Sequence, residues 1–508
     1  MSTSKTASRS ATGSRRPVLA GVAAEVRRDT ALPGLDHTGL MLAATLRALD
    51  DAGVEGTTVD AIVVPRGSWS KGNPAGRIAD EIGATTARTV IAELGITQTS
   101  AMRIAFDAIA DGADVVVVVG GETRHRDAVA KRAGGSWSID VAAMERASAS
   151  GPADVEPDQV VAPAESLVSA VEVQRHFAVP ANQYAIVESA IRHRAGRTPA
   201  EHRTHLGRLW HRFAEVAASN PDAWNRTNPS ADDIVTATPS NRLIAAPYTK
   251  SLVSQWTVDQ AAAMVFVSAE LAAGLADRSR LIYPLAAAES NLMVPLAERA
   301  DLDRWPAMGL CGQRALADAG LSIADVDLID LYSCFPAAVQ VSAAEIGVSD
   351  DVPWTVTGGM TFGGGPLNNY TFQSVVKIAE LLRTQPGSTG LTTSVSGFLT
   401  KPAVAIWSSS PDAVDAPCTW SDVTDDAVAA TARTPFDAEA TGTGTIAGYT
   451  VLPGPDGSPQ RTVAVVEING ERTIVISEDP RIAGDLLGRD GVGAVVDVLV
   501  AGQLNALR

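Results

Sequence analysis

Two stretches of the chain carry groups that could bind or transform a small molecule. The first runs from Gly358 to Gly365, where five of the eight residues are glycine, and the segment from Asn369 to Leu382 then has helical spacing. Clustered glycines indicate backbone that approaches another group closely or adopts a positive φ. A loop of this kind before a helix presents free amides, which can hold an anion, an oxyanion or the narrow arm of a cofactor. A tight turn between packed elements is the alternative interpretation.

The second stretch, Tyr332 to Phe335, places a phenol two residues from a thiol. A tyrosine hydroxyl can donate a hydrogen bond to a carbonyl oxygen, and it can exchange a proton when its pKa is lowered. Cys334 could serve as an acid or base, but a cysteine without a neighbouring cation is more often a buried, inert side chain. Tyr332 could equally be a core residue whose hydroxyl bonds to backbone.

The strongest local charge signal lies between residues 191 and 213. Against a single acid, Glu201, this segment contains Arg192, Arg194, Arg197, Arg203, Arg208 and Arg212, with His193, His202, His205 and His211. Such a patch would attract an anion, although a solvated helix face has the same pattern. Metal binding is not expected, because the chain has no HExxH motif and His211 falls off the face that His202 and His205 share.

Length and charge limit the class of protein. The 508 residues suggest roughly two to four domains, and the 45% hydrophobic content is ample for large cores. The net charge of −17 argues against a nucleic-acid partner, which would require a basic face. The cysteines Cys311, Cys334 and Cys418 are odd in number and far apart, so a disulfide framework is not expected and a reducing, cytoplasmic location is.

No segment is expected to span a membrane. The longest apolar runs, such as Val115–Val119 and Ala261–Val267, are far shorter than the roughly 20 residues that a spanning helix needs, and they are predicted to be buried strands. Residues 1–16 are rich in Ser, Thr and Arg and lack the apolar core of a secretory signal. They are predicted to form a disordered tail.

The elements that would position the candidate groups alternate between strands and helices. In the first series, strands are predicted at 18–26, 60–65, 89–94 and 115–119, with a helix at 39–52. Thr97 can cap a further helix through Ala110. After an interruption the alternation returns with a strand predicted at 261–268. In the second series, strands are predicted at 281–288, 326–332, 390–394 and 403–408, with helices at 306–319 and 336–346. This alternation predicts an α/β fold with largely parallel sheets covered on both faces.

The same patterns divide the chain into parts. These are a tail at 1–16, an N-terminal half at 17–123 and 243–280, a helical loop domain at 124–242, a second half at 281–410, a linker at 411–435 and a C-terminal domain at 436–508. The loop domain is predicted where the alternation stops and prolines interrupt helical segments. Short strands separated by turn signals such as Asn469-Gly470 predict a small β-barrel, OB-like, in the C-terminal domain.

Several motifs together resemble the thiolase superfamily, especially sterol-carrier-type thiolases and thiolase-like proteins. They are the valine strand with Gly120-Gly121-Glu122, the segment Asp259 to Ala263, the segment Leu331 to Phe335 and the glycine-rich loop. The resemblance covers about residues 16 to 410. It implies two stacked βαβ halves in five layers, α/β/α/β/α, with a loop domain over the active site, from whose side coenzyme A enters.

The resemblance also implies where thiolase chemistry would require side chains. A Claisen exchange on a thioester needs a nucleophilic thiolate, a base that activates it and an oxyanion site. The family's nucleophilic cysteine falls at Gly95, its catalytic histidine at Gly365 and its last cysteine at Ser394. The chain has no cysteine before Cys311 and no histidine after His211. The resemblance therefore implies a protein without thiolase activity.

Tyr332 and Cys334 are then the catalytic candidates. In sterol-carrier-type relatives the matching cysteine can take the acid/base role, and thiolase-fold aldolases that act on acyl-CoA thioesters use tyrosines. Because the family binds the CoA phosphates on the loop domain, the implied CoA-binding residues are Arg203, Arg208, His205 and Tyr248. We expect a protein that binds CoA or an acyl-CoA as its ligand or substrate, with no other cofactor and no metal.

Three alternatives stay open. The chain could be an acyl-CoA aldolase or related C–C lyase that uses Tyr332, an acyltransferase with non-standard residues, or a scaffold whose barrel docks another protein. Thiolases usually dimerise through the strand before the nucleophile loop, here Thr89 to Leu94. A monomer is favoured over a homodimer, because Glu93 would discourage pairing along that strand.

Overall fold

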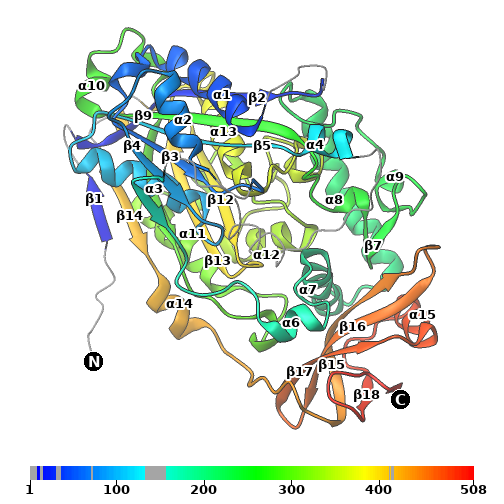
Figure 1. Ribbon diagram of the computed structural model, residues 1–508. Helices are drawn as coiled ribbons and strands as arrows, with labels where there is room; N and C mark the ends of the chain where they lie inside the picture. Colours follow the sequence, from blue (N-terminus) through cyan, green and yellow to red (C-terminus); the bar gives the residue numbers. More distant parts are fainter. Residues whose placement is uncertain are drawn as a thin grey trace.

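The computed structural model describes residues 8–11, 15–29, 36–69, 72–131, 156–410, 412–413 and 417–508. In these residues two large sheets and their helices form the body of the protein, and a third sheet, drawn in orange and red, lies at one end (Figure 1). No helix within the described ranges is long and apolar enough to cross a membrane.

The first large sheet has six strands in the order β2-β9-β5-β3-β4-β6. Their bounds in that order are Pro17–Val26, Asp259–Ser268, Val115–Thr123, Ala61–Pro65, Arg88–Ala92 and Gln159–Val161. β5, β3, β4 and β6 run parallel, while β9 pairs antiparallel with both β2 and β5. The outer edge of β4 is occupied by β6, a strand of the loop domain, and the Glu93 amide donates to the Val161 carbonyl at 2.8 Å.

The second large sheet also has six strands, in the order β1-β14-β10-β13-β12-β11. Their bounds are Ser8–Ala11, Cys418–Asp422, Tyr283–Glu289, Lys401–Ser408, Thr389–Ser396 and Leu328–Asp330. β14 runs parallel to β10 and β11 runs parallel to β12, whereas the remaining neighbours are antiparallel. Both sheets are therefore mixed, where the sequence predicts largely parallel ones.

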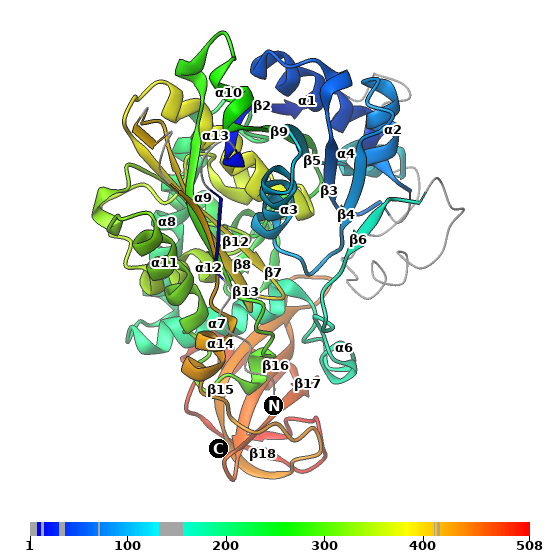
Figure 2. The same cartoon turned by 90° about the vertical axis from the view of Figure 1, so that its left-hand side faces the viewer.

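Helices separate the two sheets and cover their outer faces. α3 (Gln98–Ala110) and α13 (Tyr370–Arg383) lie between the sheets, in one core with strands of both. α1 (His37–Ala52) and α2 (Pro74–Glu81) cover the first sheet, and α11 (Pro306–Asp318) and α12 (Pro336–Ile346) cover the second. Figure 2 shows α3 between strands β3 and β4 and strands β12 and β13. These five layers, α/β/α/β/α, confirm the predicted fold class.

The predicted cap of α3 is confirmed. Thr97 Oγ1 accepts a hydrogen bond from the Ser100 amide at 3.0 Å, and the helix runs from Gln98 to Ala110. Satisfying one of the first free amides in this way stabilises a helix by about 1 kcal/mol. The apolar side chains Met102, Phe106 and Ile109 follow at helical spacing and are buried between the sheets. The N-terminus of α3 lies against the start of α13, where the Thr371 amide donates to Gln98 Oε1.

The loop domain is helical, as predicted, where it is described; residues 132–155 lie outside the described ranges. Its helices are α4 (Arg124–Lys131), α6 (Ala170–Gln174), α7 (Pro180–Arg194), α8 (Pro199–Ser219) and α9 (Ala231–Val235), followed by the hairpin of β7 (Leu243–Ala245) and β8 (Tyr248–Thr249). α8 begins with a capping box, in which Thr198 and Glu201 each bond to the other's backbone amide.

The remaining helical segments are short. They are α10 (Ala269–Ala273), α14 (Thr424–Ala430) and α15 (Pro480–Gly488), with 3-10 turns at Gly56–Thr58, Lys250–Leu252, Arg278–Arg280, Leu296–Glu298, Ile323–Asp325 and Leu367–Asn369 and a π-helical turn at Gly359–Gly363. The π-helical turn is the central part of the glycine-rich loop.

The C-terminal sheet is antiparallel, in the order β17-β16-β15-β18-β19. Its strands are Glu471–Ser477, Pro459–Ile468, Gly442–Pro453, Val495–Val498 and Ala506–Leu507. The Ile476 amide in β17 donates to Gly502 at 2.9 Å, and the Leu504 amide donates back to Ile476 at 2.8 Å. These bonds join one edge of the sheet to the segment before β19, an arrangement compatible with the predicted small barrel.

The structure differs from the expected tail and linker. Within the expected linker, β14 pairs with β10 of the second sheet, and Trp420 on β14 is buried in the core between the sheets. The sequence pattern missed β14 because its five residues, CTWSD, contain only one large apolar side chain, Trp420, and their alternation is too short to predict a strand. In the expected tail, β1 pairs with β14, while residues 1–7 and 12–14 lie outside the described ranges.

Candidate functional site

A buried carboxylate, Asp330, organises the glycine-rich loop. Asp330 ends β11 and has no exposed surface. Its Oδ2 accepts from Thr355 Oγ1 (2.9 Å), the Val356 amide (2.9 Å), the Thr357 amide (3.1 Å) and Thr357 Oγ1 (3.0 Å), and its Oδ1 accepts from Tyr370 Oη (2.9 Å) and Ser374 Oγ (2.6 Å). One acid thus ties the residues before the loop to the helix after it.

The glycines of the loop are required by close approaches. At Gly358, where φ is 92°, a Cβ atom would lie 2.6 Å from the Cα of Ala217 in α8. At Gly364, where φ is 105°, it would lie 2.0 Å from Gln260 Oε1. Only glycine combines a positive φ with backbone this close to a neighbour. The prediction that this backbone approaches another group closely is confirmed, and those groups belong to the protein itself.

The expectation of free amides in the loop is wrong for four of its residues. The amides of Gly358 and Gly359 donate to Thr355 Oγ1 at 3.0 and 3.1 Å. The Met360 amide donates to Ser333 Oγ at 3.0 Å, and the Gly365 amide donates to the Gln255 carbonyl at 2.9 Å. Groups engaged in this way are not available to an anion. The structure therefore favours the alternative interpretation, a turn between packed elements.

Tyr332 lies beside this loop, between β11 and α12. Its side chain is partly exposed, and its amide donates to Thr393 Oγ1 at 2.7 Å. The Tyr332 ring meets the edge of the Tyr370 ring, with the centroids 5.7 Å apart, so the Asp330 network also holds the ring of Tyr332. Burial raises the pKa of Tyr332, and this outweighs the opposing hydrogen bond with Gln98. Tyr332 is thus a neutral hydrogen-bond donor at neutral pH.

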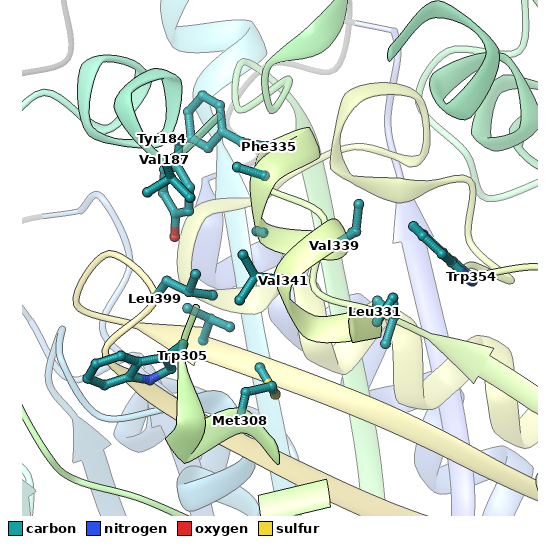
Figure 3. Close-up of a cluster of buried hydrophobic side chains, with 14 of the residues drawn as sticks. Tyr184, Val187, Trp305, Met308, Leu331, Phe335, Val339, Val341, Trp354 and Leu399 are labelled. Carbon is teal, nitrogen blue, oxygen red and sulfur yellow. The ribbon is translucent and has the colours of Figure 1, made fainter. Parts of the chain in front are cut away.

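Cys334 is partly exposed on the same segment. Burial raises the pKa of its thiol to about 12, and the hydrogen bond with Tyr184 offsets only part of this effect. A thiol with such a pKa is protonated at neutral pH and is a poor nucleophile. Tyr184 stacks on Phe335 at 4.6 Å, and Figure 3 shows the two rings together at the start of α12.

The position that the resemblance assigns to a nucleophile, Gly95, is closed by packing. Gly95 is buried, with φ at 99°, and a Cβ atom there would lie 2.7 Å from Pro163 Cγ and 3.3 Å from Leu167 Cδ2. A Cβ atom at Gly397 would lie 3.4 Å from the same Leu167 atom. The structure therefore brings the N-terminus of α3 and the turn after β12 together, and Leu167 lies between them.

The other two assigned positions are also filled. A Cβ atom at Gly365 would lie 2.1 Å from Ser254 Oγ and 3.3 Å from Met360 Cβ. Ser394 is fully buried, and its hydroxyl pairs with Thr99 Oγ1 at 2.8 Å. The sequence does not indicate that other side chains of the protein fill the space around Gly95, Gly365 and Ser394.

Introducing a cysteine at Gly95 is expected to destabilise the protein without creating thiolase activity. The positive φ and the contact with Pro163 together should lower the free energy of unfolding by about 2 to 4 kcal/mol. Urea denaturation and an acetoacetyl-CoA thiolysis assay measure the two effects. The matched control is Gly112→Cys, because Gly112 also has a positive φ but no neighbour within 4 Å. Thiolysis by Gly95→Cys, or stability no lower than that of the control, would contradict this account.

The expected CoA-binding residues do not form one accessible cluster. Tyr248 is fully buried, and its hydroxyl donates to Glu188 Oε2 at 2.7 Å, so its implied contact with CoA is corrected. His205 is half-buried and pairs with Gln340 Oε1 at 3.2 Å. Arg203 and Arg208 are exposed on α8. The sequence around Tyr248 does not indicate this contact, because Glu188 lies 60 residues earlier in the chain.

Glu188 is a second buried acid that sequence reasoning missed. Besides Tyr248, it accepts from His202 Nε2 at 2.8 Å and from Gln340 Nε2 at 2.8 Å, and it has no exposed surface. Burial alone would raise the pKa of Glu188, but these hydrogen bonds and the nearby His202 outweigh it and hold the pKa below its ordinary value. The carboxylate thereby joins α7, α8, β8 and α12 behind Phe335.

Replacing Glu188 with glutamine is expected to reduce the dependence of stability on pH. Because the folded pKa is lowered, the carboxylate stabilises the protein above the ordinary pKa of glutamic acid, and this contribution is lost as the pH falls through the folded value. Urea denaturation across the acidic range should give a shallower slope for Glu188→Gln. It should also give an unfolding free energy about 3 to 5 kcal/mol lower at neutral pH. Glu215→Gln, at an exposed acid on α8, is the control. Equal slopes for Glu188→Gln and the wild type would refute this role.

The first two arginines of the basic run in the loop domain bind other parts of the protein. Arg192 donates to Asp490 Oδ1 at 2.9 Å and to Tyr449 Oη at 2.8 Å, both in the C-terminal domain. Arg194 donates to Asp303 Oδ1 at 2.8 Å. These contacts pair two of the six arginines that the sequence suggested for an anion, and those of Arg192 join the C-terminal sheet to α7, below which it lies (Figure 1).

Two cavities are described in this region, and neither is lined by Tyr332 or Cys334. A groove of about 310 Å³ lies between α8 and residues 353–355, with Phe213 and Trp354 in its walls. A cavity of about 10 Å³ lies behind Gly363 and Gly364. Among the described residues, no group of three or more His, Cys, Asp and Glu side chains could hold a metal ion.

The two mixed sheets, the paired central helices α3 and α13 and the convergence of the four motif segments define a thiolase-type fold. Comparison with solved structures agrees. Over 97% of this chain and 100% of the other, the structure is similar to a monomeric SCP2-thiolase-like protein, type 1, from Mycobacterium smegmatis, with 26% identity and a TM-score of 0.78. These similarities support the resemblance to the thiolase superfamily that the motifs implied.

More distant relatives share the fold. The Ltp2–ChsH2(DUF35) aldolase matches with 22% identity and a TM-score of 0.56, over 77% of this chain and 97% of that one. The Acat5 thiolase from Ascaris suum, solved in complex with coenzyme A, matches with 15% identity and a TM-score of 0.56, over 77% and 99%. A curated acetyl-CoA acetyltransferase from Methanothermobacter thermautotrophicus (strain Delta H) is 23% identical over 423 residues, which cover 75% of this chain and all of that protein. No model of a known protein family matches the chain.

Proposed function

We propose that this protein binds CoA or an acyl-CoA and does not catalyse thiolysis or Claisen condensation. The observation that carries the proposal is the packing at Gly95 and Gly365, where side chains of the protein occupy the space that a cysteine and a histidine would need. The absence of any cysteine before Cys311 supports it. Without a thiolate and a base, covalent exchange at a thioester has no route.

The same site keeps groups that suit recognition of a thioester. Tyr332 and Cys334 are partly exposed, and the raised pKa values keep both in the protonated form that donates hydrogen bonds. A neutral phenol can donate to the carbonyl oxygen of a thioester without attacking its carbon. The solved CoA complex of a distant relative with the same fold supports CoA as the ligand class. Arg203 and Arg208, both exposed, are the candidates for the phosphates.

Two measurements on the full chain test this function. In the first, acetoacetyl-CoA and CoA are mixed with the protein, and no thiolysis is expected; turnover in the ordinary range of about 1 to 10³ per second would overturn the proposal. In the second, calorimetry with CoA and acetyl-CoA is expected to give saturable heat. Tyr332→Phe should weaken acetyl-CoA binding more than CoA binding, because only the former has a thioester carbonyl. No heat with any CoA species would favour the scaffold alternative instead.

A second candidate function is cleavage of a β-hydroxyacyl-CoA by Tyr332. It is favoured by the partial exposure of Tyr332 beside Gln98 and by the aldolase among the proteins that share the fold. The raised pKa of Tyr332 suits proton donation better than proton abstraction. Cleavage of such thioesters that is lost in Tyr332→Phe while binding persists would establish this function. No cleavage across a panel of chain lengths would exclude it.

A further inference from the structure

A small cavity lies behind the glycine-rich loop, away from Tyr332 and Cys334. Its volume is about 10 Å³, and it is bounded by Gly363 and Gly364 of the loop, by β9 and by α13. Its lining includes the side chains of Gln260, Gln373 and Lys377. The volume is close to the roughly 10 to 15 Å³ that one water molecule requires.

Two side-chain amides in the cavity wall have an atom without a hydrogen-bond partner. They are Gln260 Oε1 and Gln373 Nε2, and the two residues are 1% and 8% exposed. The orientation of Gln260 is fixed, because its Nε2 donates to the Gly363 carbonyl at 2.9 Å and to the Asp222 carbonyl at 3.3 Å. A buried acceptor and a buried donor without partners thus belong to two residues that line the same cavity, and each unpaired group of this kind is costly.

The charges around the cavity favour a neutral occupant. Lys377 Nζ lies 2.7 Å from Asp222 Oδ2 and also pairs with Glu380, so the wall already contains a cation next to its counter-ions. The ammonium group disfavours a metal cation, and the Asp222 carboxylate and Gln260 Oε1 disfavour an anion. The occupant must therefore be small, uncharged and able both to donate and to accept hydrogen bonds.

We propose that one water molecule is bound in this cavity, where it donates to Gln260 Oε1 and accepts from Gln373 Nε2. The water links β9 to α13 directly behind Gly364, whose backbone is in contact with the Gln260 side chain. It thereby adds to the support of the glycine-rich loop next to the Asp330 network, whose residues Thr357 and Tyr370 also line the cavity. This inference concerns the scaffold and is independent of the proposed CoA binding.

A crystal structure of the full chain at a resolution of about 1.5 Å or better tests the proposal. A single density peak is expected at about 2.7 to 3.2 Å from both Gln260 Oε1 and Gln373 Nε2. In the variant Gln373→Met, which keeps a similar length but has no donor, this peak should disappear. An empty cavity in the wild type, or a direct hydrogen bond between the two amides, would overturn the inference.

Hydrogen exchange in solution gives a second readout. In Gln373→Met, backbone amides of residues 358–365 should exchange about fivefold faster, the ratio expected for the loss of one hydrogen bond. Gln385→Met, at an exposed residue after α13, should leave their exchange unchanged. Unchanged exchange in Gln373→Met would contradict the supporting role of the water. If Gln373→Met does not fold, the density in the wild type decides the question.

Discussion

Replacing Asp330 with asparagine is expected to lower the free energy of unfolding by about 3 to 5 kcal/mol, the range for disrupting a buried charged network. The carboxylate accepts six hydrogen bonds, two of them from backbone amides. An asparagine has the same shape, but its NH₂ group would face donors at one of the two oxygen positions and leave them unpaired. Equilibrium urea denaturation followed by circular dichroism measures the change.

The control for this variant is Asp350→Asn, which removes the same charge from an exposed position. It should change the unfolding free energy by less than about 0.5 kcal/mol. Thermal melting of both variants distinguishes the loss of the network from a change in net charge. A denaturation midpoint of Asp330→Asn equal to that of Asp350→Asn would show that the network contributes little.

Replacing Gly358 with alanine is expected to cost about 3 kcal/mol or more. The backbone at this position has a φ of 92°, and the new Cβ atom would lie 2.4 Å from the Cβ and 2.7 Å from the amide nitrogen of Ala217. Since these are atoms of α8, relief requires a shift of the helix or of the loop. Loosening of the loop domain should follow, which limited proteolysis and thermal melting can detect.

Gly387→Ala separates the two causes. Gly387 has a φ of 87°, but no atom lies within 4 Å of a Cβ atom there. Its substitution should cost only the backbone strain of about 1 to 2 kcal/mol. If Gly358→Ala and Gly387→Ala are equally destabilising, the approach of α8 to the loop is not an important contact.

Much of the fold could be predicted from the sequence because the strongest elements carry local signals. The five consecutive valines of β5 and the Thr97 cap of α3 are recognisable within a few residues. β14 and β6 carry no such signal, because each is short and is a strand only through its pairing with a distant neighbour. The antiparallel position of β9 between β2 and β5 likewise depends on contacts far apart in the chain.

The candidate site was only partly predictable, for the same physical reason. The glycine-rich loop and Tyr332 are visible as motifs, but the direction of the loop's amides is set by Thr355 and Ser333. The sequence carries one signal of this network, since Asp330 is a charged residue between the apolar residues Ile329 and Leu331 of a predicted strand. Such a residue needs several partners when it is buried, and it therefore indicates a network.

Strand β6 affects how two copies of this chain could associate. β4 has β3 on one side and β6 on the other, so its backbone groups are already paired within the chain. A second copy that paired along β4 would have to displace a strand tethered nearby, whose effective concentration is on the order of millimolar. At ordinary protein concentrations, β6 of the same chain should therefore pair with β4 in preference to a strand of a second copy. This argument agrees with the preference for a monomer that the sequence suggests.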